Sequence, residues 1–233
     1  MLWFPKKPEN RKVQRYKELR EATRKLVNVI LKVIPKEIIN RAAKEMNILV
    51  KGVLVFDSEE EMSFLFDRIL YDIKWDGKNA IEHFEAESEY EPSEDEKKYI
   101  NAMKEARFSL FEVVGRNPGK SVYLSDLLSG ILLNSQIELT DLSMSETFSN
   151  GLLLATRIIR IDDICMTTGA SYPFMPIHKD ALISGVKKLQ NVKQGKDPDK
   201  IKEFDISHEY SLYFYKQHRK IGLEVATTEE WEE

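Results

Sequence analysis

The sequence predicts an α+β protein in which N-terminal and C-terminal helices flank a small, bent antiparallel sheet or partial barrel. Two observations carry this prediction. Apolar residues recur at three- and four-residue steps before residue 108 and again after residue 176, which is the period of an amphipathic helix. Between these parts, short β-prone runs alternate with turn signals such as Asn117-Pro118-Gly119, a pattern typical of a sheet of short strands.

The N-terminal part predicts two helices. In residues 9–34 the apolar side chains fall on one helical face. Pro35 ends this helix, because proline has no backbone N–H and clashes with the preceding turn. A second helix is expected over residues 36–49, before Gly52 breaks the pattern.

Two later helices begin with a serine followed by a glutamate three residues on. In such a capping box each side chain bonds the backbone N–H of the other residue. Ser58 and Glu61 predict a helix over residues 58–73. A second box at Ser93 predicts a helix over residues 93–107, and a shorter helix is expected between the two.

The central part predicts a series of short strands that ends with a turn at Thr167-Thr168-Gly169 and a last strand. The expected strands cover residues 109–114, 122–124, 127–133, 136–139, 152–164 and 172–175. A helix is expected over residues 178–189, and Asp197-Pro198 is a start signal for a final helix that stops before Gly222. The expected division is 1–56 (basic helical part), 57–108 (helical part), 109–176 (β module), 177–222 (C-terminal helices) and 223–233 (acidic tail), with 57–222 as one unit.

Several spaced blocks resemble an uncharacterised bacterial region that is often found beside SEC-C metal-binding motifs. These blocks are Leu65–Asp72, Gly77–Phe84, Ser109–Val114, Pro118–Lys120 and Leu124–Gly130. The resemblance covers about residues 60–190 and implies a bacterial setting, but no activity. A SEC-C motif needs several cysteines, and Cys165 is the chain's single cysteine, so zinc binding and the partners of that motif are not carried over.

The composition places the chain among soluble proteins of a reducing compartment. Its one cysteine cannot form an internal disulfide, and no stretch approaches the roughly 20 apolar residues that span a bilayer. The N-terminus has no apolar run of signal-peptide length before its first charges. We therefore expect a cytoplasmic protein without a membrane span, and no motif predicts a metal or a cofactor.

Charge is distributed unevenly along the chain. Residues 1–54 contain 14 basic and five acidic residues, a net charge of +9, whereas the whole chain has a net charge of −4. This polarity has two interpretations: the basic part binds an anionic partner, or it attracts the acidic remainder of the same chain.

The first helix carries the residues that would contact phosphates if the first interpretation holds. They are Arg11, Lys12, Arg15, Arg20, Arg24 and Lys25. A row of cations on one helix can neutralise a nucleic-acid backbone. It can equally be a solvated helix face, with Glu18 and Glu21 as local partners.

No catalytic signature stands out. We expect foremost a non-enzymatic protein that binds an unidentified protein partner, or nucleic acid through the basic helix. The alternative is a hydrolase-like enzyme with a dispersed site at the edge of the β module, built from His178, Asp126 and Asp162. Such a site needs these three side chains to meet in one polar cleft.

Overall fold

The computed structural model describes residues 8–128, 136–194 and 203–223 and confirms the α+β class. The predicted strand over residues 127–133 extends beyond the described part. The helix start at Asp197-Pro198 lies outside it, as does all but the first residue of the predicted tail.

Helices form most of the described chain. They are α1 (Pro8–Lys32), α2 (Lys36–Met46), α3 (Glu60–Asp67), α4 (Ala80–Glu87), α5 (Glu94–Lys104), α6 (Leu142–Thr147), α7 (Lys179–Gln194) and α8 (Glu203–Ile221). A π-helical turn, η1 (Arg68–Asp72), continues α3, and a 3-10 turn, η2 (Pro176–His178), precedes α7. Within the described ranges, no helix combines the length and apolarity needed to cross a membrane.

The main sheet is antiparallel, with its strands in the order β5-β4-β3-β6-β7. Its strands are β3 (Arg107–Asn117), β4 (Ser121–Asp126), β5 (Ile137–Thr140), β6 (Leu153–Ile161) and β7 (Ile164–Phe174). The sheet bends until its edge strands β5 and β7 come close, but they do not pair, so the barrel stays open. A separate hairpin consists of β1 (Leu49–Val50) and β2 (Val53–Leu54).

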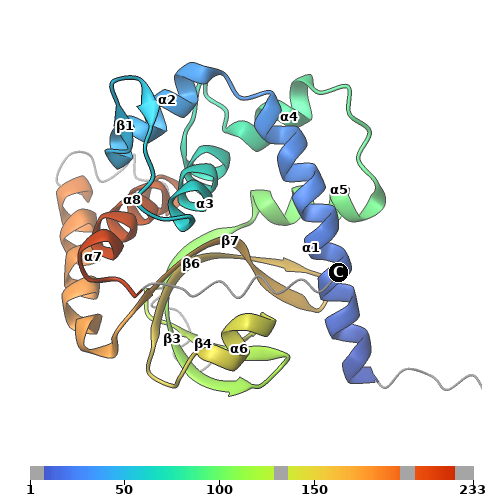
Figure 1. Cartoon of the computed structure of the whole chain (residues 1–233), viewed down its shortest axis with the longest axis vertical. Helices are drawn as coiled ribbons and strands as arrows, with labels where there is room; N and C mark the ends of the chain where they lie inside the picture. Colours follow the sequence, from blue (N-terminus) through green and yellow to red (C-terminus); the bar gives the residue numbers. More distant parts are fainter. Residues whose placement is uncertain (1–7, 129–135, 195–202, 224–233) are drawn as a thin grey trace, which may run out of the picture.

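Each face of the sheet buries its own apolar cluster. Leu153 belongs to the larger cluster with the helices, and the next residue, Leu154, belongs to the smaller cluster. This split follows from the two-residue period of a strand. Figure 1 shows α3 and α8 on one side of the bent sheet and the short helix α6 on the other. The larger cluster extends from Tyr16 in α1 to Tyr215 in α8.

The predicted capping box at Ser58 is wrong. Helix α3 begins at Glu60, and no side chain caps its start. The Glu61 carboxylate instead accepts the Asp57 N–H at 2.7 Å and the Tyr215 hydroxyl at 2.8 Å. The contact with α8 buries Glu61 and draws its carboxylate away from Ser58.

The predicted capping box at Ser93 is confirmed. The Ser93 N–H donates to Glu96 Oε2 at 2.8 Å, and the Glu96 N–H donates to the Ser93 hydroxyl at 3.4 Å. Helix α4 has a second box, between Asn79 and Glu82, which was not predicted. Its signal was present, because asparagine is as good an N-cap as serine.

The predicted strand over residues 152–164 is confirmed except for its end, and the predicted turn at Thr167-Thr168-Gly169 is wrong. β6 ends at Ile161, and the chain reverses at Asp162-Asp163 before β7. β7 then continues through Thr167–Gly169. Thr168–Ala170 lie opposite the single residue Arg157 of β6, so the turn signal marks a bulge. Helix α6 was not predicted; Asp141 caps it by accepting the Met144 N–H at 2.9 Å.

Candidate functional site

The basic helix α1 lies along the open side of the sheet, past which it runs in Figure 1. Lys12 Nζ is 2.9 Å from Glu138 Oε2 on edge strand β5. Arg20 donates to the carbonyl and the hydroxyl of Thr167 on edge strand β7, each at 3.0 Å. Asp141, just after β5, lies 3.7 Å from the same guanidinium. Two cations of α1 thus join the two edge strands that do not pair with each other.

The other predicted phosphate-binding residues also have partners in the chain, with one exception. Arg15 makes a two-pronged contact with Asp95 of α5, at 2.6 and 2.5 Å. Lys25 pairs with Glu21 at 2.7 Å on the surface of the same helix, and Arg24 also interacts with another residue of the chain. Arg11 is exposed and makes no ion pair with a described residue. These contacts favour attraction within the chain for the partnered residues.

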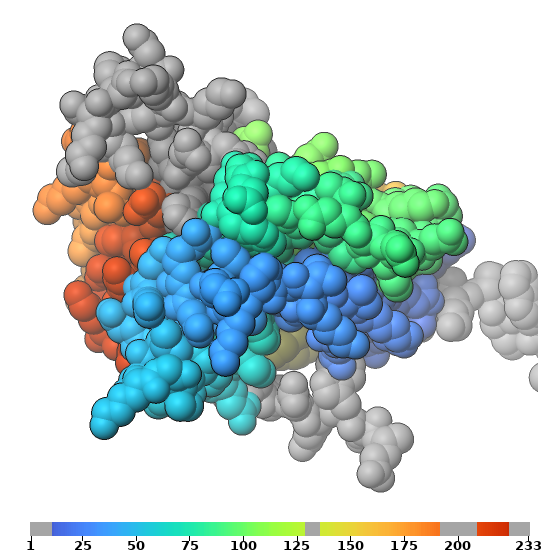
Figure 2. Space-filling view, turned by 90° about the horizontal axis from the view of Figure 1, so that it is seen from above, coloured from blue at the N-terminus to red at the C-terminus, as the bar shows by residue number. Residues whose placement is uncertain are grey.

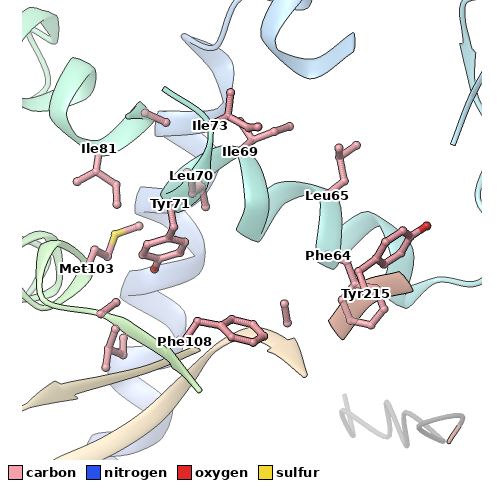
Figure 3. Close-up of a cluster of buried hydrophobic side chains, with 14 of the residues drawn as sticks. Phe64, Leu65, Ile69, Leu70, Tyr71, Ile73, Ile81, Met103, Phe108 and Tyr215 are labelled. Carbon is pink, nitrogen blue, oxygen red and sulfur yellow. The ribbon is translucent and has the colours of Figure 1, made fainter. Parts of the chain in front are cut away.

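A second group of charges lies inside the molecule, where the π-helical turn η1 meets β6. Arg157 is only 2% exposed. Its Nη2 donates to Asp72 Oδ1 at 2.7 Å, and its Nε donates to Asp67 Oδ2 at 3.3 Å. The guanidinium also lies over the Tyr71 ring, 4.4 Å from its centroid. In Figure 3, Tyr71 points into the apolar cluster near Met103 and Phe108.

Hydrogen bonds extend this group to three further elements. Thr168, in the β7 bulge, donates to Asp67 Oδ1 at 2.5 Å. Ser211 of α8 donates to Asp72 Oδ2, and Arg68 reaches both Ser211 and Glu45 of α2. We call Arg157, Asp67, Asp72, Arg68, Glu45, Thr168 and Ser211 the buried charge network.

The π-helical geometry explains why so many polar side chains of η1 turn inward. A π turn widens the helix by one residue, so Arg68, Tyr71 and Asp72 are all buried within five positions. Burial raises the pKa of Asp67 even though Arg157 opposes this shift. Burial would lower the pKa of Arg157, but Asp72 and Asp67 outweigh it and raise that pKa.

The chemistry of the network is therefore that of a fixed, charged cross-link between the helices and the sheet. Sequence reasoning did not find it, although Arg157 within an apolar strand was a signal. A charged residue in a buried run needs a partner, and Asp67 and Asp72 are acids within a similarly apolar run.

The network reaches the surface at Glu45. A shallow groove of about 350 Å³ on α2 is lined by Glu37, Asn40, Arg41, Lys44 and Glu45. Arg41 Nη2 also donates to the Lys74 carbonyl at 2.5 Å, which ties α2 to the segment after η1.

Beside this groove, the β1–β2 hairpin exposes apolar side chains. Val50 and Val53 face each other across the hairpin and are 51% and 63% exposed. Val55 and Met62 are exposed as well. Figure 2 shows α2 and the light-blue hairpin on one face of the molecule, with the hairpin projecting at a corner. We call this surface the hairpin face.

The structure does not assemble the predicted enzyme site. Asp126 accepts the Ser109 hydroxyl at 2.5 Å and the Leu128 N–H at 2.9 Å. Asp162 lies at the far end of the β6–β7 hairpin from His178 and pairs with Lys98 at 2.9 Å. The nine residues of β6, roughly 30 Å along the strand, separate the two ends. The hypothesis of a single cleft with these three groups loses its geometric support.

Metal-binding and thiol chemistry also lack a geometric basis in the described chain. Among the residues that the structure describes, no three His, Cys, Asp or Glu side chains are grouped as a metal site requires. Cys165 is buried in β7, and burial raises the pKa of its thiol. A thiol with a raised pKa is a poor nucleophile.

Comparison with known protein families assigns the chain to a family. A model described as a family of unknown function, DUF7986, matches residues 10–228. The chain belongs to this family. No curated protein and no solved structure matches the chain. The DUF7986 match bears out an uncharacterised family, and the association with SEC-C motifs stays a prediction.

Proposed function

We propose that this DUF7986 protein is a non-enzymatic binding protein and that it binds a protein partner through the hairpin face. The observation that carries the proposal is the cross-strand pair of Val50 and Val53, which a water-exposed hairpin leaves uncovered. Exposed apolar side chains that gather on one surface are typical of protein contacts. A two-stranded hairpin is also marginally stable alone, so a partner that adds a strand or covers the valines would stabilise it.

Charge on α2 and at the hairpin tip indicates the kind of partner. Lys36, Arg41 and Lys44 of α2 and Lys51 at the hairpin tip are exposed, whereas Glu37 is the one exposed acid on α2. Complementary potentials favour association. The proposed partner is therefore a protein segment with apolar side chains flanked by carboxylates. We propose a bacterial cytoplasm as the setting, which the chain's single, buried cysteine supports.

Site-specific photo-crosslinking tests this proposal. A photoreactive residue at Lys51 should capture one protein in the source cell, and the same residue at Asp163, the tip of another hairpin, should not. The captured protein is then purified and its affinity measured directly. The double substitution V50T/V53T keeps the β-branched shape and replaces one methyl group by a hydroxyl at each position. Each lost methyl group removes about 0.8 kcal/mol of apolar binding energy. Binding should weaken about tenfold.

The matched control is I177T, since Ile177 is 85% exposed at η2 and far from the hairpin in the chain. I177T should bind as tightly as the unchanged protein. Equal affinity of V50T/V53T, or identical crosslinks from Lys51 and Asp163, contradicts the proposal.

Nucleic-acid binding through α1 is the second candidate, supported by the outward face of that helix. Arg11, Lys17, Arg24, Lys25 and Lys32 are exposed there, against Glu18 and Glu21. The structure sharpens the test, because reversing Arg15 or Arg20 would break internal contacts. R11E/K17E/K32E leaves those contacts in place.

Fluorescence anisotropy with labelled single-stranded and duplex oligonucleotides at 50 mM salt measures this binding. If α1 is the contact, the triple variant loses binding, and the salt slope of the unchanged protein is near −0.9 for each phosphate contact on a duplex. Absence of binding at 50 mM salt excludes this candidate.

A further inference from the structure

A tight turn connects η1 to α4. Trp75 and Lys78 exchange both backbone hydrogen bonds, at 2.9 and 3.0 Å. Asp76 and Gly77 between them have φ values of 48° and 80°, the left-handed pair of a two-residue hairpin turn. Within the turn, Trp75 and Lys78 are joined by these two backbone bonds, and the Trp75 side also contacts α4.

His83 of α4 contacts Trp75 in two ways, and a third contact, to Glu87 of the same helix, orients its ring. Its ring stacks on the Trp75 indole, with centroids 4.2 Å apart and planes 8° from parallel. Nε2 lies 2.9 Å from the Trp75 carbonyl oxygen, and Nδ1 lies 2.8 Å from Glu87 Oε1. Both partners are acceptors. A neutral imidazole has one N–H and can satisfy only one of them, whereas the imidazolium donates to both.

We propose that His83 is a pH-sensitive latch: the protonated ring clamps the Trp75–Lys78 turn onto α4, and deprotonation loosens the turn. A cation stacked on an indole face is further stabilised by the ring's quadrupole. Loss of the proton removes this attraction together with one of the two hydrogen bonds.

The charges around the ring favour the protonated state. Glu87 on the same helix is the carboxylate at the ring, and Lys78 on the turn opposes it. Lys104 of α5 reaches α4 at Glu85 instead, with Nζ 2.8 Å from Oε1. Burial lowers the pKa of His83, but the bonds to the Trp75 carbonyl and Glu87 outweigh it, so the pKa is raised above 6.5.

The sign of the effect follows. Because the folded-state pKa is raised, the latch contributes fully below pH 6.5 and is lost as the pH rises through the folded-state pKa. The segment it holds includes the Lys74 carbonyl, which receives Arg41 of α2. Loosening of the turn would therefore also weaken its link to Arg41, which lines the α2 groove. The latch stands independently of the binding role proposed above.

Tryptophan fluorescence provides the test, because a protonated imidazole stacked on an indole quenches its emission. In the full chain with Trp3 and Trp231 replaced by Phe, Trp75 emission should rise with pH around a midpoint above 6.5. E87Q should lower that midpoint. E85Q is the matched control on the same helix and should leave it unchanged.

Amide exchange measures the loosening itself. After correction for the intrinsic pH dependence, protection of the Lys78 amide should fall through the same midpoint, by about tenfold for each unit by which the His83 pKa is raised. H83Q should abolish both transitions. A midpoint at or below 6.5, an E87Q midpoint equal to that of E85Q, or constant Lys78 protection overturns the latch. If H83Q does not fold, the comparison of the E87Q and E85Q midpoints tests the latch on its own.

Discussion

Helix α1 and the buried charge network both place arginines against acids of another element, but they do so in different surroundings. Arg15 and Asp95 meet where each side chain is about a third exposed. Arg157 meets Asp72 with both side chains almost wholly buried. Water screens the first pair, so its contribution is typically below about 1 kcal/mol. Removing one partner of a buried pair leaves an uncompensated charge and costs about 3–5 kcal/mol.

The difference separates two uses of charge in this chain. The network links η1, β6 and α8, and loss of one buried member leaves its charged partner uncompensated. The contacts of α1 orient the helix along the open side of the sheet, and each can be lost singly. The uneven distribution of charge along the sequence is therefore a weak guide to the interactions that stabilise the fold. The two aspartates within an apolar run are a better guide.

The largest effect is expected at Arg157. R157M keeps an unbranched side chain but leaves Asp67 and Asp72 without their cation, and should lower the free energy of unfolding by about 3–5 kcal/mol. Urea unfolding followed by circular dichroism measures this. R160M, at an exposed position on the same strand, should stay within about 0.5 kcal/mol of the unchanged protein. Equal losses from the two variants contradict the role given to the network.

A smaller effect is expected at Arg20, which joins α1 to the edge strand β7. R20M removes hydrogen bonds from a charged group to Thr167, and should cost about 1.5 kcal/mol in the same unfolding measurement. K17M, on the exposed face of α1, provides the baseline. If R20M and K17M lower the free energy of unfolding equally, this contact does not stabilise the packing of α1 against the sheet edge.

Two serines that look alike in the sequence should differ. S93A removes a working N-cap and should cost about 1 kcal/mol. S58A should cost almost nothing, because no side chain caps α3. Thermal unfolding of the two variants separates them, and a larger loss from S58A would contradict the capping assignments.

Among the substitutions expected to destabilise the protein, the smallest effect is expected at the Arg15–Asp95 pair. R15A should cost less than about 1 kcal/mol, and the cost should shrink further in 1 M salt. The hydrogen bond from Arg15 lowers the pKa of Asp95, so this stabilisation is present above pH 3.8 and fades as the pH falls through the lowered pKa. Melting temperatures at pH 5 and pH 3 should differ less in R15A than in the unchanged protein.

The elements that sequence reasoning predicted correctly are those with local causes. Pro35 stops α1, Ser93 begins α5, and the period of three to four residues identifies the helices. The missed features depend on residues far apart in the chain. Glu61 leaves Ser58 because Tyr215, 154 positions later, offers a buried hydroxyl. Thr167–Gly169 has the residues of a turn, but its pairing with β6 keeps it in a strand as a bulge.

The candidate site also combines features that are evident from local sequence with features that depend on distant residues. The basic residues of α1 were identifiable from sequence, but their partners Glu138, Asp95 and Thr167 were not, because folding brings them together. The hairpin face was not predicted either, since whether Val50 and Val53 are covered is decided by what packs around them.

Paired double-mutant cycles compare the two regions most directly. One cycle combines R157M with D72N, and the other combines R15M with D95N, each read as a coupling free energy from urea unfolding. We predict a coupling for Arg157–Asp72 that exceeds the Arg15–Asp95 coupling by about 2 kcal/mol or more. Equal couplings, or a larger one at the surface, would contradict this prediction.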